Sequence, residues 1–97
     1  MSPQASSTVP RARGRRVTLF TARGCHLCEQ ALAVVHEARA RSAFELETVD
    51  ITGDSRLEAE YRTLLPVIEV DGVRAFTYFV TVEALLDRLR GDGSPPR

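Results

Sequence analysis

The chain has 97 residues, of which 43% are hydrophobic and 27% charged, and this composition excludes fibrous, collagen-like and fully disordered proteins and fits one small domain. Its apolar runs are only a few residues long, so no membrane-spanning helix is expected. The net charge is zero but uneven: residues 1–16 hold four arginines and no acid, residues 91–97 hold one charge of each sign, and the body between them is therefore −4. An acidic body argues against nucleic acid as a partner, because phosphate binding needs a basic face.

Residues 1–16 are rich in Ser, Pro, Gly and Arg and have no hydrophobic periodicity, which predicts a flexible basic head. A short Arg cluster in such a stretch is more often a solubilising end than an arm for nucleic acid or a membrane. The head lacks the apolar segment of a secretory signal, so we expect a cytoplasmic protein in a reducing compartment. Residues 17–90 should form the domain, and residues 91–97 a flexible tail.

The first half of the domain predicts a strand, a helix and a second strand. Val17–Phe20 is a short β-prone run, and the loop at 21–24 contains Gly24, which suits a tight turn. Residues 25–40 show helical periodicity, and residues 44–51 partly alternate as a strand does. The helix is expected to bury one stripe, formed by Leu27, Ala31, Val34, Val35 and Ala38.

The second half predicts a helix at 55–62, strands at 67–70 and 73–77, and a helix at 82–90. Ser55 begins a capping-box pattern, Asp71-Gly72 is a strong hairpin turn signal, and Thr81 is a suitable N-cap. The order is thus β-α-β-α-β-β-α, an α/β fold. Strands separated by helices are expected to be parallel, and the hairpin antiparallel. We therefore predict a mixed four-stranded sheet with helices on both faces.

Cys25 and Cys28 are the candidate catalytic residues. Cys25 opens the first helix, where unpaired N–H groups and the helix dipole stabilise an anion, so its thiol is expected to ionise readily and act as the nucleophile. Cys28 lies one turn deeper, at a spacing that permits a disulfide, and is the candidate resolving thiol. A disulfide between two cysteines three residues apart would close a very short loop and add little stability, so their closeness indicates a chemical role rather than a structural one.

The residues near the cysteines are expected to tune their redox chemistry. Arg23 would add to the stabilisation of a thiolate at Cys25, and His26 would favour it as well, making the couple more oxidising. A lone C-x-x-C also occurs in zinc sites, but structural zinc needs four ligands and the chain offers only His26 and His36 in addition. We therefore predict no metal here.

Leu65-Pro66 is the candidate substrate-binding segment. Pro66 follows a helix closely and begins a strand that should lie beside the first one, opposite Cys25. The predicted topology favours a cis peptide bond at this proline, which would present the backbone of Leu65 to an extended substrate segment.

With these residues placed, the chain resembles the glutaredoxin-like branch of the thioredoxin superfamily, and in particular a group of short bacterial glutaredoxin family proteins. The segments that carry the resemblance are residues 19–29, Val49-Asp50-Ile51, and Tyr61 through Leu65-Pro66-Val67-Ile68 to Asp71-Gly72. The chain departs from glutaredoxins by His26-Leu27 in place of Pro-Tyr, and by residues 76–81, which lack a Gly-Gly pair and acidic residues.

The resemblance implies a thioredoxin-like fold and dithiol reduction of protein or low-molecular-weight disulfides, with Pro66 as a cis-proline. No tightly bound cofactor is expected. Electrons would come from glutathione, another low-molecular-weight thiol or a flavin reductase, and the protein is expected to be a monomer without nucleic-acid or membrane partners. An iron–sulfur or metal carrier that uses the same cysteines is the alternative function.

Overall fold

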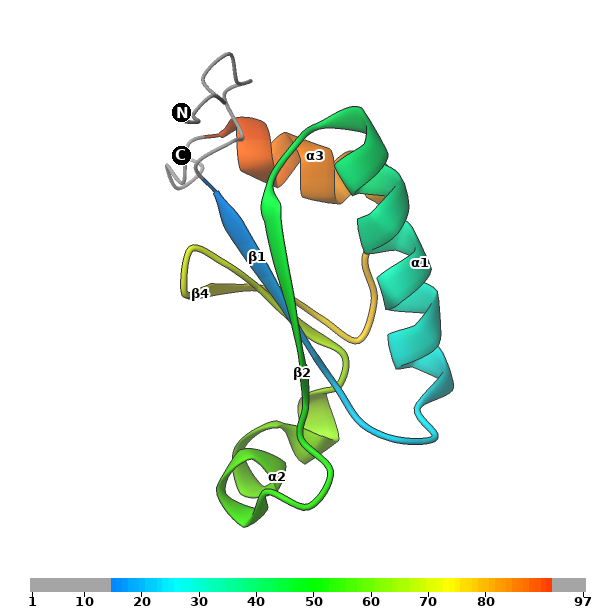
Figure 1. The fold of residues 1–97 in the computed structure, drawn as a ribbon, viewed down its shortest axis with the longest axis vertical. Helices are drawn as coiled ribbons and strands as arrows, with labels where there is room; N and C mark the ends of the chain where they lie inside the picture. The colour runs from blue at the N-terminus through cyan, green and yellow to red at the C-terminus, as the bar shows by residue number, and fades with distance from the viewer. Residues whose placement is uncertain (1–14, 92–97) are drawn as a thin grey trace, which may run out of the picture.

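The computed structural model describes residues 15–91, so most of the predicted head and tail lies outside the described residues. Its elements are β1 (Arg16–Thr21), α1 (His26–Arg41), β2 (Glu45–Asp50), α2 (Ser55–Tyr61), the 3-10 helix η3 (Arg62–Leu64), β3 (Val67–Val70), β4 (Val73–Thr77) and α3 (Val82–Arg90) (Figure 1). This is the predicted order, with small shifts at the boundaries and one added 3-10 turn. Within the described part, no helix has the length and apolar character needed to cross a membrane.

The four strands form one mixed sheet in the order β2-β1-β3-β4. β1 and β2 are parallel as predicted, with Thr21 opposite Asp50 at their C-terminal ends. β3 and β4 form the predicted antiparallel hairpin. Its turn residues Asp71 and Gly72 have φ angles of 54° and 82°, and this left-handed pair suits a two-residue hairpin turn.

The pairing of β3 with β1 is antiparallel, so the prediction that strands separated by helices would be parallel is wrong for this pair. The reason is the length of the connection. α2 has 7 residues and rises only about 10 Å, whereas the 6-residue β1 spans about 20 Å. The chain therefore re-enters the sheet at the end where β2 left it (Figure 1). Because of this reversal, β3 begins beside the C-terminal end of β1, where α1 also starts.

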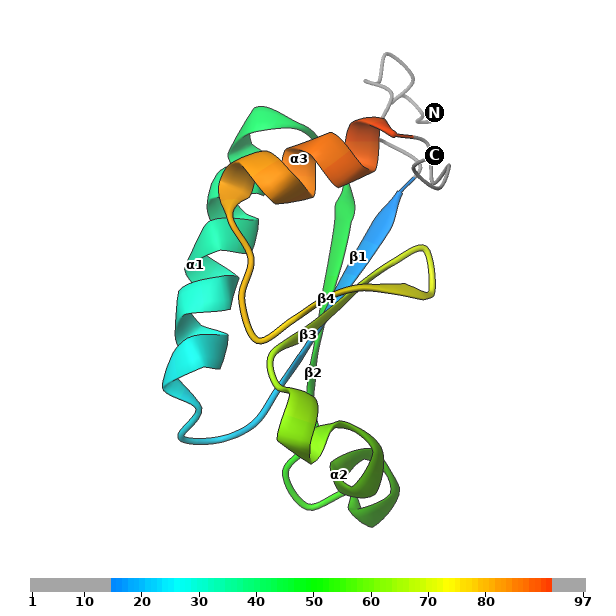
Figure 2. The same cartoon turned by 180° about the vertical axis from the view of Figure 1, so that it is seen from behind.

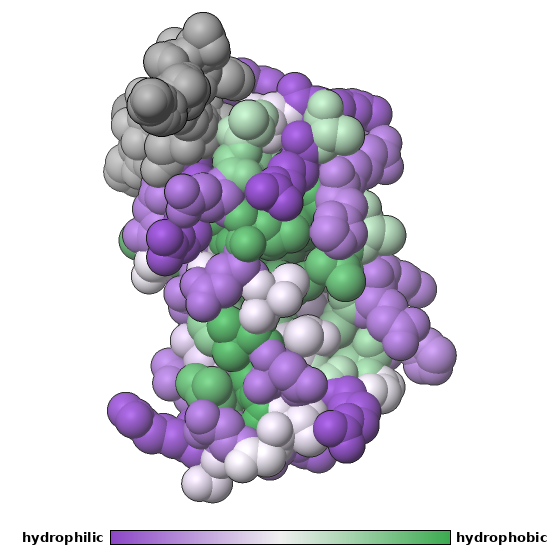
Figure 3. Space-filling model, in the orientation of Figure 1, coloured by the Kyte–Doolittle hydropathy of each residue, from purple (hydrophilic) through white to green (hydrophobic). Residues whose placement is uncertain are grey.

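The sheet has an apolar core on each face, because alternate side chains of β1 and β3 point to opposite sides. Val17 and Leu19 belong to a cluster covered by α1 and α3, which lie on the same side of the sheet in Figure 2. Phe20 and Val67 pack instead with Tyr61 of α2, and the rings of Phe20 and Tyr61 stack with centroids 4.2 Å apart. Helices therefore cover both faces, as predicted. In the view of Figure 3, apolar residues form a central band between polar residues.

The buried stripe of α1 begins at Cys28 and not at Leu27. Its buried members are Cys28, Ala31, Val35 and Ala38. Leu27 is 48% exposed, so its predicted burial is wrong. At about 100° of rotation per residue, Leu27 and Cys28 lie on either side of the line formed by Ala31, Val35 and Ala38, so the helical period alone does not choose between them, and packing buries Cys28. Leu27 is thereby left on the surface between the two cysteines.

The N-cap of α2 is Asp54, which corrects the predicted capping box at Ser55. The Asp54 carboxylate accepts the backbone N–H groups of Arg56 and Leu57 over 3.1 and 3.0 Å. Gly53, the residue before the cap, donates its N–H to the Glu58 carboxylate over 2.9 Å. An aspartate in the cap position accepts both N–H groups with one carboxylate oxygen, so Ser55 becomes the first helical residue.

Candidate active site

The two cysteines lie where β1 ends and α1 begins. The chain turns through Gly24, which has a φ of 79°, and the N–H of Cys25 donates to the carbonyl of Ala22 over 3.2 Å. Cys25 is the N-cap of α1, one position before the first helical residue. Its Sγ accepts the N–H of Cys28 at 3.1 Å. The sulfur of Cys25 therefore lies at the positive end of the helix dipole and accepts a hydrogen bond from an N–H group of the first turn.

Cys25 and Cys28 are joined as a disulfide, and their Cα atoms are 5.2 Å apart. The two cysteines differ sharply in exposure: Cys28 is 1% exposed, whereas Cys25 is half-buried. An incoming molecule can therefore reach the sulfur of Cys25 but not that of Cys28. This asymmetry distinguishes the two positions chemically.

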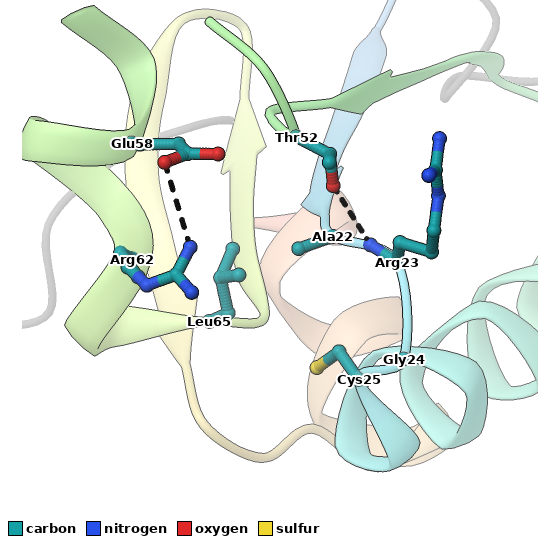
Figure 4. A pocket seen from close by; sticks show the side chains of 8 residues that line it. All are labelled: Ala22, Arg23, Gly24, Cys25, Thr52, Glu58, Arg62 and Leu65. Carbon is teal, nitrogen blue, oxygen red and sulfur yellow. Dashed lines mark hydrogen bonds and ion pairs between the residues drawn. The ribbon is translucent and has the colours of Figure 1, made fainter. Parts of the chain in front are cut away.

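A cleft of about 440 Å³ opens beside Cys25 (Figure 4). It is lined by Ala22, Arg23, Gly24, Cys25, Thr52, Glu58, Arg62 and Leu65. The structure thus brings Leu65 and Cys25 to the same cleft, although 40 residues separate them in sequence. The Leu65-Pro66 peptide bond is cis, and Leu65 has an extended backbone. Among the described residues, none donates a hydrogen bond to the Leu65 carbonyl.

Arg23 contributes its backbone rather than its charge to this cleft. Its N–H donates to the Thr52 hydroxyl over 2.9 Å, while its side chain extends away from Cys25 (Figure 4). Thr52 also donates its own N–H to Asp50 over 2.9 Å. The hydrogen bonds from the backbone and side chain of Thr52 hold the pKa of Asp50 below its ordinary 3.8, and Arg23 lowers it further through its charge. This network fixes the loop that precedes Cys25.

Arg62 is the cation that faces the cleft, and sequence reasoning missed it. Its guanidinium lies near Leu65 and is 3.6 Å from the Glu58 carboxylate (Figure 4). Glu58 is held in turn by the N–H of Gly53. The only sequence signal for Arg62 is its position shortly before Leu65-Pro66, and the pattern of the helix does not distinguish it from other exposed positions.

His26 points into solvent. Its side chain is 91% exposed, and its Nδ1 lies 4.0 Å from the Glu29 carboxylate. The redox-tuning roles of His26 and Arg23 stay predictions. Within residues 15–91, no three His, Cys, Asp or Glu side chains come together as a metal-binding group.

Residues 16–90 match the profile of the glutaredoxin-like domain family (DUF836). The chain belongs to this family. An uncharacterized protein of Mycobacterium tuberculosis is 34% identical over 92 residues, covering 84% of this chain and 91% of the relative.

Solved structures agree with this glutaredoxin-like assignment. The X-ray structure of protein XcR50 from X. campestris has a TM-score of 0.67 and 30% identity, covering 81% of this chain and 99% of that one. Thioredoxin-2 of the malaria parasite secretion machinery has a TM-score of 0.65 at 18% identity, covering 80% and 82% of the two chains, and shows likeness of fold alone. The glutaredoxin-like chain thus has the predicted thioredoxin-like fold. Its C-x-x-C pair, within disulfide distance, supports a role of the thiol–disulfide oxidoreductase type.

Proposed function

We propose that this glutaredoxin-like protein reduces disulfides of proteins or small molecules by a dithiol mechanism, with Cys25 as nucleophile and Cys28 as resolving thiol. The observation that carries the proposal is the asymmetry of the pair. The sulfur of Cys25 caps α1 and lines an open cleft, whereas Cys28 is buried one turn behind it. A hydrogen bond to an anion favours the ionised form, so the N–H of Cys28 supports Cys25 as the thiolate.

The reaction would proceed by two exchanges. The Cys25 thiolate attacks one sulfur of the substrate disulfide, whose S–S bond breaks; one half leaves as a thiolate and the other stays on Cys25 as a mixed disulfide. The deprotonated Cys28 then attacks the sulfur of Cys25 and releases the second half. The substrate has gained two electrons and takes two protons from water, and the protein ends with the Cys25–Cys28 disulfide.

A thiol donor would restore the dithiol. One thiolate attacks the sulfur of Cys25 and releases Cys28, and a second removes the first from Cys25 as an oxidised disulfide. Glutathione or another low-molecular-weight thiol fits this role. The guanidinium of Arg62 in the cleft supports a donor that carries a carboxylate, because Arg pairs well with carboxylates.

Cysteine variants test the division of roles. Cys25→Ser is expected to abolish turnover with a small disulfide such as bis(2-hydroxyethyl) disulfide. Cys28→Ser is expected to accumulate a mixed disulfide at Cys25, visible by mass spectrometry under non-reducing conditions. In the reduced wild-type protein, iodoacetamide should alkylate Cys25 at neutral pH at least about tenfold faster than a model thiol, because of its larger thiolate fraction.

Cys28→Ala is a useful companion because Cys28 is 1% exposed, and a serine hydroxyl there could itself disturb the core. Both Cys28 variants should give the same trapped species if resolution is the role of this residue. Normal turnover by Cys25→Ser, or alkylation of Cys25 no faster than that of the model thiol, would contradict the proposal.

A further inference from the structure

Two of the large hydrophobic residues that are exposed in the described chain, Tyr78 and Phe79, are consecutive. Four large hydrophobic residues are exposed in residues 15–91: Leu27 at 48%, Val73 at 58%, Tyr78 at 51% and Phe79 at 71%. Leu27 lies between the two cysteines. Tyr78 and Phe79, which we call the aromatic pair, follow β4 directly. Val73 alone lies elsewhere, in the β3–β4 hairpin at the start of β4. Two adjacent exposed aromatic side chains form an apolar surface of the kind that marks an interaction site.

Backbone hydrogen bonds attach the aromatic pair to the candidate active site. The N–H of Tyr78 donates to the carbonyl of Pro66 over 2.9 Å. Pro66 is bonded to Leu65, which lines the same cleft as Cys25. The connection from β4 to α3 that carries the pair turns beside the start of β3 (Figure 2). The backbone of Tyr78 is thus one hydrogen bond and one peptide bond away from Leu65, which lines the cleft.

The turn that presents the pair is strained. Tyr78 has a φ of 67°, in the left-handed region that disfavours residues with a Cβ. The N–H of Phe79 donates to the carbonyl of Thr77 over 2.7 Å, which closes a tight turn around Tyr78. A glycine would relieve this strain, yet the position holds a large aromatic side chain that is half exposed. Strain retained beside a reactive centre points to a function of the side chain.

We propose that the aromatic pair docks an extended segment of a disulfide-bearing protein, with an apolar side chain of that segment next to its reacting cysteine. The inference rests on the proposed function and specifies its substrate class. Two backbone hydrogen bonds fix the turn that carries the pair, so little backbone conformational entropy is lost there when a partner binds. The Leu65 carbonyl, which accepts no hydrogen bond among the described residues, is available to an N–H of the same segment.

Two peptides test this docking. Both carry one cysteine in a mixed disulfide with 2-mercaptoethanol, and they differ only in the residues flanking that cysteine, which are leucine in one and serine in the other. The wild-type protein is expected to reduce the leucine peptide about tenfold faster, by kcat/KM, since apolar contact with the aromatic pair is gained only there. The readout is the ratio of the two kcat/KM values.

Three variants separate docking from folding. Phe79→Ser and Tyr78→Gly should each lower the ratio, and together they should bring it to about one. Tyr78→Gly suits the positive φ, so its thermal stability should equal or exceed that of the wild type and misfolding would not explain the loss. Val73→Ser removes an apolar group whose exposed fraction, 58%, lies between those of Tyr78 and Phe79, and it should keep the wild-type ratio because Val73 lies elsewhere.

Different outcomes identify what has failed. If the wild type reduces both peptides equally, or the double variant keeps the preference, the docking proposal is wrong while the dithiol chemistry stands. If the wild type reduces neither peptide nor bis(2-hydroxyethyl) disulfide, the proposed function itself fails. Sedimentation should show a wild-type monomer; a dimer that Phe79→Ser dissociates would assign the aromatic pair to self-association and overturn the proposal.

Discussion

Arg62 and Arg23 show how the direction of a side chain decides its chemical use. Both line the cleft, but the guanidinium of Arg62 lies within it near Leu65, whereas that of Arg23 extends away from Cys25 (Figure 4). The guanidinium of Arg62 also forms an ion pair with the Glu58 carboxylate, 3.6 Å away, which orients it. The carboxylate of a thiol bound at Cys25 would therefore pair with Arg62 rather than with Arg23.

Arg62→Ala is expected to raise the KM for glutathione as reductant about three- to tenfold, equivalent to roughly 1 kcal/mol for a solvent-exposed charge pair. The KM for 2-mercaptoethanol, which carries no carboxylate, should change little. Coupled turnover with bis(2-hydroxyethyl) disulfide measures both values. Arg23→Ala is the matched control and should have the smaller effect on glutathione; a larger effect for Arg23→Ala would reverse the assignment.

At the scale of elements, α2 and η3 carry one wall of the cleft. α2 supplies Glu58, η3 begins with Arg62, and Leu65 follows η3 directly. Tyr61, the last residue of α2, holds α2 and η3 against the sheet. Its ring stacks on Phe20, and its hydroxyl donates to the Glu69 carboxylate over 3.1 Å. Burial and the neighbouring Glu69 carboxylate raise the pKa of Tyr61, so its hydroxyl stays protonated as a donor. The stability of so short a helix depends strongly on its N-cap.

Asp54→Ala should lower the free energy of unfolding by about 1 kcal/mol, because two N–H groups of the first turn of α2 lose their acceptor. Urea unfolding followed by circular dichroism measures the change. Ser55→Ala is the control and should change stability by only a few tenths of a kcal/mol, because serine at this position is helical and alanine has the higher helix propensity. Equal losses for both variants would show that Asp54 is not the functional cap.

At the scale of the whole molecule, the candidate site and a polar tether occupy opposite ends of β1. At the start of β1, the Arg15 guanidinium donates to the Asp71 carboxylate over 2.8 Å and to the Leu89 carbonyl over 2.9 Å. The N–H of Arg16 also donates to Asp71. This tether joins β1, the β3–β4 hairpin and the end of α3, and it includes two arginines that the sequence analysis assigned to the head.

Asp71→Asn tests the contribution of this tether through its pH dependence. Burial raises the pKa of Asp71, but the N–H of Arg16 and the charge of Arg15 outweigh it, so the pKa in the folded protein lies below the ordinary 3.8. A lowered folded-state pKa adds stability above the unfolded-state value, and this stability is lost as the pH falls through the folded-state value. Near neutral pH the variant should be about 0.5–1 kcal/mol less stable.

The difference in unfolding free energy between the wild type and Asp71→Asn should therefore shrink when the pH is taken from 6 to below about 3.8. Thermal or urea unfolding measures this difference. Asparagine tolerates the left-handed backbone at this position, so the turn is kept. Iodoacetamide reactivity of Cys25 should be unchanged, because the tether lies at the other end of β1. A deficit that stays constant with pH would mean that charge is not the source of the effect.

Local pattern was enough to predict the order of elements and the placement of Cys25. A β-prone run, a glycine turn and a helical period make Cys25 a helix-start residue whatever the rest of the chain does. The Asp71-Gly72 turn is equally local, because two consecutive left-handed residues suffice to define the hairpin. By itself, therefore, the sequence determined the element order and the redox motif.

Only the tertiary structure decided the direction of β3, the exposure of Leu27 and the identity of the cation in the cleft. β3 runs antiparallel to β1 because α2 is too short to carry the chain back along the sheet, and this reversal brings Leu65 and Arg62 to Cys25. Leu27 and Cys28 are both compatible with the helical period, and packing against the sheet selects Cys28 for burial. Such outcomes depend on contacts between segments far apart in sequence, which periodicity within one segment does not contain.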